Sequence, residues 1–221
     1  MNRPEEHSHR QSMLAAARQL VARGLNRGTS GNISVRCNDG LLLTPSGVSV
    51  DALTSDMMVK LDFEGNARVA INNTKPSSEW RMHRDILAAR PDVGAVVHTH
   101  ATFATTLACL HRDIPPFHYM IALAGGDSIR CAPYALFGSQ TLSDHALTAL
   151  TDRYACLLAQ HGMIALGRDL DHALAIAEEV ESLCEQYWRV LQIGEPKLLS
   201  PAQMADVLEQ FKTYGQWKRH E

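Results

Sequence analysis

Three histidines lie at the ends of apolar segments, where they could bind a metal ion. AVVHTH (95–100) ends in His98 and His100, and His161 lies between the apolar segments 155–160 and 163–166. Residues i and i+2 of a strand point to the same face, so His98 and His100 are expected to project together. A catalytic zinc site needs three protein ligands and an open position. His161 is the best candidate for the third ligand because it too is placed at a strand end.

An acidic residue and three loops could complete such a site. Glu79 follows Ser77 and Ser78 at the start of an expected helix. It could act as a catalytic carboxylate, or it could only complement the helix dipole while one of the serines caps the helix. The loops GTSGN (28–32), TPSG (44–47) and SS (77–78) offer hydroxyls and backbone N–H groups, which form anion-binding concavities. Each loop alone is typical of an ordinary turn, but three beside a metal site predict a phosphorylated small substrate.

The other histidines and the cysteines are expected to have no part in this chemistry. The sequence has no C-x-x-C, and its five cysteines are interpreted as reduced, mostly buried thiols. We expect His118 to be a satisfied core histidine, with stabilisation of its loop as the alternative. The remaining histidines are expected to have no functional role, either solvated near the termini or placed on helices and turns: His7, His9, His83, His111, His145, His172 and His220.

The elements that must position these residues alternate between strand and helix. Apolar runs and alternation predict strands at 32–36, 41–44, 57–62, 95–100, 129–132, 155–160 and 163–166. Helical spacing and end signals predict helices at 12–23, 79–90, 102–110, 142–150, 171–192 and 200–212. Interleaved strands and helices indicate an α/β fold, with a central mixed or antiparallel sheet flanked by helices. A length of 221 residues suits one domain over 1–221.

Composition argues against several classes of partner. The formal net charge is -3 and no block of Lys and Arg occurs, so we expect no nucleic-acid partner. No apolar run approaches the length of a membrane span, and MNRPEEHSHR is unlike a signal peptide, so we expect a cytoplasmic protein that does not bind membranes. Neither G-x-x-x-x-G-K-[ST] nor G-x-G-x-x-G is present, which argues against an ATPase or a dinucleotide site.

Seven blocks together resemble the class II aldolase/adducin family, and within it the bacterial enzymes of the L-fuculose-phosphate type. Their order and spacing agree over nearly the whole chain, which implies a class II aldolase-like fold in a single domain. The blocks are GLNRGTSGNISVR (24–36), LLTPSG (42–47), PSSEWRMH (76–83), AVVHTH (95–100), IPPFHYMIALAGGDSIRCAPYALFG (114–138), QHGMIA (160–165) and FKTYG (211–215).

The resemblance implies a role for each matching residue. It implies one zinc ion per subunit on His98, His100 and His161, with Glu79 as acid/base and as a further ligand in the empty site. It implies that the substrate phosphate is held by Gly31, Asn32, Ser46, Gly47, Ser77 and Ser78. Tyr119 would assist protonation on the aldehyde side, and Phe137 and Tyr214 would shape the aldehyde pocket. The family also implies a homotetramer with the site between subunits.

The activity implied is cleavage of L-fuculose 1-phosphate, or a closely related ketose 1-phosphate, to dihydroxyacetone phosphate and L-lactaldehyde. Such cleavage leaves an enediolate, which a zinc ion acting as a Lewis acid would stabilise. Four other activities of the family stay open: 5-deoxypentulose-phosphate aldolase, pentulose-phosphate 4-epimerase, methylthioribulose-phosphate dehydratase and sugar-acid-phosphate decarboxylase. The epimerase has aspartate where this chain has Glu79, which favours an aldolase. A non-catalytic, adducin-like binding module is the remote alternative.

Overall fold

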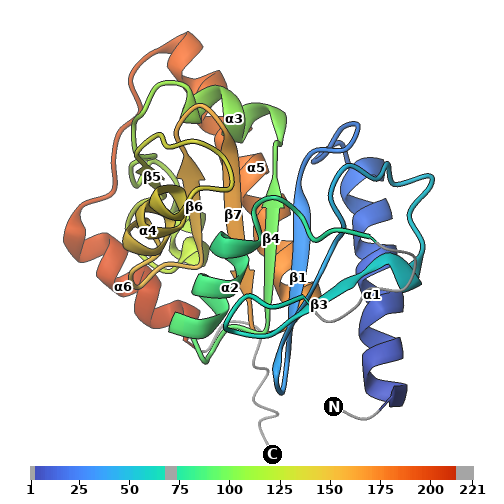
Figure 1. Ribbon diagram of the computed structural model, residues 1–221. Helices are drawn as coiled ribbons and strands as arrows, with labels where there is room; N and C mark the ends of the chain where they lie inside the picture. Colours follow the sequence, from blue (N-terminus) through green and yellow to red (C-terminus); the bar gives the residue numbers. More distant parts are fainter. Residues whose placement is uncertain (1–2, 68–73, 213–221) are drawn as a thin grey trace, which may run out of the picture.

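The computed structural model describes residues 3–67 and 74–212, which form one sheet covered by helices (Figure 1). The strand order is β3-β2-β1-β4-β7-β6-β5. In this sheet β5 and β6 run parallel and the other neighbours run antiparallel, so the sheet is mixed, as predicted. The strands are β1 (Asn32–Cys37), β2 (Gly40–Leu43), β3 (Val59–Leu61), β4 (Ala95–Thr99), β5 (Arg130–Ala132), β6 (Ala155–Leu158) and β7 (Gly162–Gly167).

Helices cover both faces of the sheet, and each face has its own apolar core. α1 (Arg3–Ala22), α3 (Thr102–Ala108) and α5 (Leu170–Ile193) pack on one face, and α2 (Trp80–Ala89) and α4 (Gln140–Ala149) pack on the other. In Figure 1, α5 lies behind β4 and β7 while α2 lies in front of them. α6 (Pro201–Phe211) packs against the short 3-10 helix η3 (Tyr119–Ala124). Strands buried on both sides read as continuous apolar runs, which explains the composition of β4 and β7.

The central position of β4 brings distant parts of the chain together. β4 pairs with β1 on one side, where His98 is opposite Asn32. It pairs with β7 on the other side, where Thr99 is opposite Met163. The carboxyl end of β4 therefore lies beside the start of β1 and the turn that enters β7, two of the segments singled out from the sequence.

Three elements differ most from the sequence prediction. α1 begins at Arg3, whereas the sequence predicts a start at Ser12. Residues 3–11 lack the apolar periodicity on which that prediction depends, and polar contacts of Glu6 and Arg10 hold this part of the helix. Arg10 donates to the carbonyl of Met58 at 2.6 Å and pairs with Glu6 at 2.7 Å. The strand expected at 57–62 contains only Val59–Leu61, preceded by the 3-10 helix η1 (Ser55–Met57). No sequence pattern predicted the 3-10 helix η3.

The end of the chain behaves as expected up to residue 212. Ser200 caps α6, accepting from the backbone N–H of Gln203, and Pro201 takes the first helical position. Among residues 3–67 and 74–212, no helix combines the length and the apolar character that a membrane crossing requires.

Candidate metal centre

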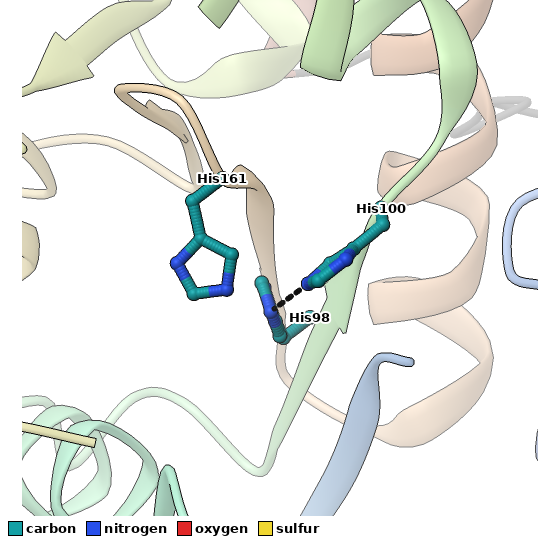
Figure 2. A group of neighbouring side chains, drawn as sticks. All are labelled: His98, His100 and His161. Atoms are coloured by element: carbon teal, nitrogen blue, oxygen red, sulfur yellow. Dashed lines mark hydrogen bonds between the residues drawn. The ribbon is translucent and has the colours of Figure 1, made fainter. Parts of the chain in front are cut away.

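The three predicted histidines converge on one point (Figure 2). His98 comes from β4, His100 lies just beyond the end of that strand, and His161 lies in the turn between β6 and β7. One potential ligand nitrogen from each ring lies within 4.8 Å of the other two. The Nε2 atoms of His98 and His100 are 3.1 Å apart. This spacing suits a single small cation that all three imidazoles touch.

The surroundings of the rings also suit a metal. His98 is fully buried, and its Nδ1 lies 2.9 Å from the carbonyl oxygen of Met163, to which it donates. That bond fixes the ring and leaves Nε2 as the lone-pair nitrogen, which is the arrangement metal-ligating histidines usually show. Burial lowers the pKa of His100 and of His161 to about 4, so both rings are neutral near pH 7. Neutral imidazole is the form that binds metal.

Gly162 allows the turn to approach β4 closely. A Cβ atom at this position would lie 2.3 Å from the carbonyl oxygen of Thr99 and 3.1 Å from Cδ2 of His100. Gln160, two residues earlier, has a positive φ of 55°. The close approach is what places His161 opposite His98 and His100, so a glycine is required beside the third histidine.

Glu79 points its carboxylate into the histidine cluster. Its Oε2 lies 3.2 Å from Nε2 of His98, and its Oε1 lies 3.3 Å from Nε2 of His161. Asn32 donates from Nδ2 to Oε2 at 2.8 Å, whereas Oε1 is buried without a hydrogen-bond partner. Glu79 is the N-cap residue of α2, but its side chain makes no capping bond. The helix-dipole interpretation is therefore insufficient, because the carboxylate serves the cluster and not the helix end.

Opposing effects set the protonation of Glu79. Burial acts to raise the pKa of its carboxyl, but the adjacent His98 and His161 and the hydrogen bond from Asn32 outweigh burial, so the pKa lies well below its usual value. Burial acts to lower the pKa of His98, and the Glu79 carboxylate raises it above the ordinary value. A buried anion beside imidazole nitrogens, with one oxygen unpaired, is a site that a cation would complete.

A cleft of about 350 Å³ opens beside this cluster and contains the predicted phosphate-binding residues. Its walls are Thr29, Ser30, Gly31, Asn32, Pro45, Ser46, Gly47, Ser77, Ser78, Glu79, His100, Tyr134, Ala135, Phe137, Gln160 and His161. The three loops singled out from the sequence therefore share one cavity with two histidines and the carboxylate. Tyr134, Ala135 and Gln160 were not singled out individually, although each lies within a sequence block that carried the family resemblance.

Two predicted aldehyde-side residues are not brought to the cleft by the described chain. Tyr119 is 48% exposed on η3, where its ring lies 4.9 Å from that of His118 and 6.5 Å from that of Phe211. It is absent from the walls of the cleft. Tyr214 lies outside the described residues. Phe137 does line the cleft, with 62% of its surface exposed.

His83 and His118 differ from their interpretations. His83 was expected to have no functional role, yet it is fully buried and its Nε2 bonds Oδ1 of Asn32. His118 is half-buried, and its Nδ1 accepts from the backbone N–H of Met120 at 3.3 Å, which caps η3. The alternative interpretation of His118, as a residue that stabilises its loop, is therefore the correct one. Packing of α2 against the sheet, which no local pattern reveals, buries His83.

Comparison with known proteins now decides the family. Residues 11–188 match the model described as the Class II Aldolase and Adducin N-terminal domain. The chain belongs to the class II aldolase and adducin family. A solved structure of an L-fuculose 1-phosphate aldolase superposes with a TM-score of 0.88 at 38% identity, covering 92% of this chain and 95% of that one. The class II aldolase fold expected from the sequence is thus confirmed.

Relatives within the class II aldolase family carry two different substrate names. The 5-methylthioribulose-1-phosphate/5-deoxyribulose-1-phosphate aldolase of Rhodospirillum rubrum is 59% identical over 206 residues, which are 93% of this chain and 92% of the relative. The L-fuculose phosphate aldolase of Escherichia coli is 48% identical over 198 residues, which are 89% of this chain and 91% of the relative. The family is common to both, and the substrate is the point on which they differ.

Proposed function

We propose that this chain is a zinc-dependent aldolase that cleaves a ketose 1-phosphate and releases dihydroxyacetone phosphate. The observation that carries the proposal is the convergence of His98, His100, His161 and Glu79 beside the cleft, which three of them line. The family supports a lyase, and a complete cluster argues against a non-catalytic, adducin-like module.

His98, His100 and His161 would hold the metal, with Glu79 as a further ligand before substrate arrives. When bound, the ion supplies positive charge beside the substrate oxygens on which negative charge develops. Neutral imidazoles do not diminish that charge, and three of them suit zinc. Glu79 is the carboxylate nearest the histidines in the described chain, so it is the group assigned to proton transfer.

The loops at 28–32, 44–47 and 77–78 would bind the phosphate through hydroxyls and backbone N–H groups. Gly31, Asn32, Ser46, Gly47, Ser77 and Ser78 are the residues proposed for this role, and all of them line the cleft. Holding the phosphate fixes one end of the substrate and aligns the bond to be broken with Glu79.

For the substrate we propose a 5-deoxypentulose 1-phosphate, namely 5-methylthioribulose 1-phosphate or 5-deoxyribulose 1-phosphate. These compounds and L-fuculose 1-phosphate share the carbons that become dihydroxyacetone phosphate and differ only in the aldehyde half. The wall formed by Tyr134, Ala135 and Phe137 is largely apolar and suits a methyl or methylthio group. The relative at 59% identity supports this choice over L-fuculose 1-phosphate, the second candidate, which is supported by the relative at 48%.

A homotetramer, with the site between subunits, completes the proposal. Tyr119 is exposed and lies away from the cleft of its own chain, so it would assist protonation in the cleft of a neighbouring subunit. Tyr214, outside the described residues, is proposed for the aldehyde pocket with Phe137. Light scattering of the purified protein tests the assembly, and mixing inactive Glu79→Gln chains with inactive Tyr119→Phe chains tests sharing, because mixed tetramers should regain activity.

The test of the activity is release of dihydroxyacetone phosphate from the three ketose phosphates, followed by coupled oxidation of NADH. We expect chelator-sensitive release, with the highest kcat/KM for one of the two 5-deoxypentulose phosphates. A higher kcat/KM for L-fuculose 1-phosphate would reverse the substrate assignment. No release from zinc-loaded protein with any of them would contradict the aldolase proposal.

A further inference from the structure

A chain of four buried polar groups runs from the sheet to the carboxylate at the centre of the site. Ser34 Oγ lies 2.7 Å from Nδ1 of His83, and Nε2 of His83 bonds Oδ1 of Asn32. Asn32 then donates from Nδ2 to Oε2 of Glu79 at 2.8 Å. Ser34 and His83 are fully buried, and the exposed fractions of Asn32 and Glu79 are only 7% and 6%. Buried networks of this kind fix one arrangement when every member is satisfied.

The direction of each bond follows from the anion at its end. A carboxylate only accepts, so the amide of Asn32 must turn its NH₂ group to Glu79 and its oxygen to His83. An amide oxygen also only accepts, so His83 must carry its proton on Nε2. Nδ1 is then the acceptor, and Ser34 donates to it. Every donor therefore points towards Glu79, and burial, which lowers the pKa of His83 to about 3, keeps that ring neutral.

We infer that His83 is a positioning residue of the active site, which fixes the amide of Asn32 and through it the carboxylate of Glu79. This inference rests on the proposed role of Glu79 in proton transfer. Held by Asn32 at Oε2, the carboxylate keeps Oε1, which is buried without a hydrogen-bond partner, 3.3 Å from Nε2 of His161. With the other tautomer of His83, the amide of Asn32 would turn its oxygen to the carboxylate and repel it.

The inference gives Asn32 a second task beside the one implied by the family resemblance. Its side chain bonds both Glu79 and His83, and the residue also lines the cleft. His83 itself does not line the cleft, so it would act on the reaction only through Asn32.

Two substitutions of the same residue test the inference. The amide of glutamine reaches the position of Nε2 in histidine, whereas the amide of asparagine reaches only the position of Nδ1. His83→Asn should lower kcat about tenfold to a hundredfold with KM and zinc content near wild type. His83→Gln should retain most of the activity because it can still donate to Asn32. Equal kcat in the wild type and His83→Asn, or equal losses in the two variants, would overturn the inference.

A spectroscopic measurement on the wild-type protein tests the inference without relying on a variant that loses activity or fails to fold. Nitrogen chemical shifts of ¹⁵N-histidine-labelled wild-type protein, with His83→Gln used to assign the signal, report which ring nitrogen carries the proton. We expect protonation at Nε2. Protonation at Nδ1 of His83 would overturn the inference even if His83→Asn failed to fold.

Two serines provide a matched control. Ser34 and Ser143 are both fully buried, but the hydroxyl of Ser143 donates to Asp85 at 2.7 Å, away from the cleft. Ser34→Ala should lower kcat and Ser143→Ala should not. Equal kcat values would count against the chain of four buried polar groups. Glu79→Gln is measured beside them. If it is inactive while His83→Asn is fully active, only this inference fails; if it is fully active, the proposed function of Glu79 fails first.

Discussion

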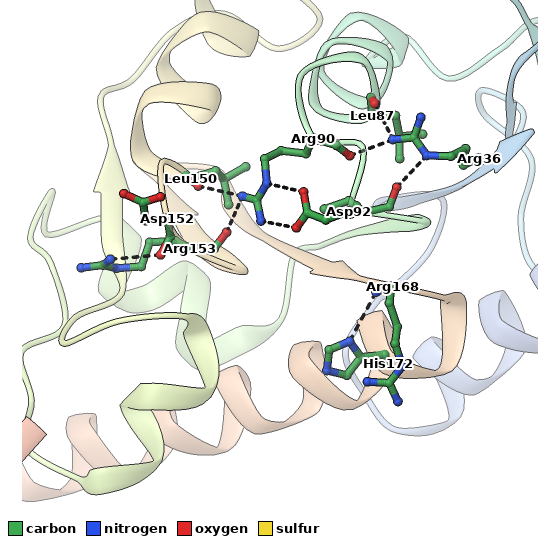
Figure 3. Close-up of polar contacts among 10 residues, drawn as sticks. Arg36, Leu87, Arg90, Asp92, Leu150, Asp152, Arg153, Arg168 and His172 are labelled. Carbon is green, nitrogen blue, oxygen red and sulfur yellow. Dashed lines mark hydrogen bonds and ion pairs between the residues drawn. The ribbon is translucent and has the colours of Figure 1, made fainter. Parts of the chain in front are cut away.

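The two ends of the central strand β4 hold their polar groups in opposite ways. At its amino end, Arg36 donates to the carbonyls of Leu87, Arg90 and Val93, and Arg90 donates to those of Leu150 and Arg153 (Figure 3). Arg90 also forms a two-bond ion pair with Asp92 at 2.8 and 2.9 Å. These guanidinium groups satisfy carbonyl groups at the end of α2 and in the loops around it.

At the carboxyl end of β4, polar groups converge, and not all of their hydrogen-bonding capacity is used. Oε1 of Glu79 has no hydrogen-bond partner, and imidazole nitrogens from three histidines face a common point. The difference separates two purposes: the arginine end stabilises the fold, whereas the histidine end keeps the donor atoms that we propose for an ion and a substrate. Substitutions at the histidine end should therefore change zinc content and activity, and substitutions at the arginine end should change the free energy of unfolding.

The largest effect is expected from His98→Ala. Removal of this fully buried ligand should release the metal and lower kcat/KM by about a thousandfold or more. Zinc content and kcat/KM are measured together. His172→Ala is the control, because His172 lies at the opposite end, where its Nδ1 accepts from the backbone N–H of Arg168 at 3.4 Å. Retention of zinc and activity by His98→Ala would contradict the assigned centre.

Glu79→Gln should give the next largest effect and separate chemistry from metal binding. The amide cannot take up a proton, so kcat should fall by about 10²–10⁴-fold. Zinc should stay bound because the three histidines remain. Full activity of this variant would remove the acid/base assignment.

Arg90→Ala should show the converse behaviour at the arginine end. It removes two charge-assisted bonds to carbonyls, so the free energy of unfolding should fall by about 2–3 kcal/mol. The ion pair with half-exposed Asp92 adds little to that figure. Urea unfolding measures the change, and kcat of the folded variant should equal that of the wild type. A loss of kcat would mean that the two ends are coupled.

The smallest predicted effect is a difference in acid sensitivity. His83 has a pKa of about 3 in the folded protein because of burial, against 6.5 for an ordinary histidine. Between these two pH values the unfolded chain binds one more proton than the folded chain at this residue. The contribution of neutral His83 to the free energy of unfolding is therefore fully present above pH 6.5 and falls as the pH is lowered. His83→Gln should remove up to about 1.4 kcal/mol per pH unit of this dependence. Urea unfolding of the metal-free wild type and His83→Gln at pH 6 and pH 5 tests this. The same change in the free energy of unfolding between the two pH values in both proteins would contradict it.

The histidine centre could be predicted from the sequence because its signals are local. His98 and His100 follow from the period of a strand, and His161 follows from its place at a strand end. The role of His83 could not be predicted, because it depends on the contact of α2 with β1. The start of α1 was missed for a similar reason, since Glu6 and Arg10 are held by partners near β3. Tyr119 shows a further limit: a family motif names a residue without saying which chain's cleft it serves.

Gly162 contributes no side chain, yet its missing methyl group has consequences for mutational tolerance. Any other residue there would press on Thr99 and His100 and displace the third ligand together with the second. In a saturation library scored for bound zinc, position 162 should therefore be as intolerant as position 98 or 161. A search for the determinants of the metal centre that considered only donor atoms would overlook it.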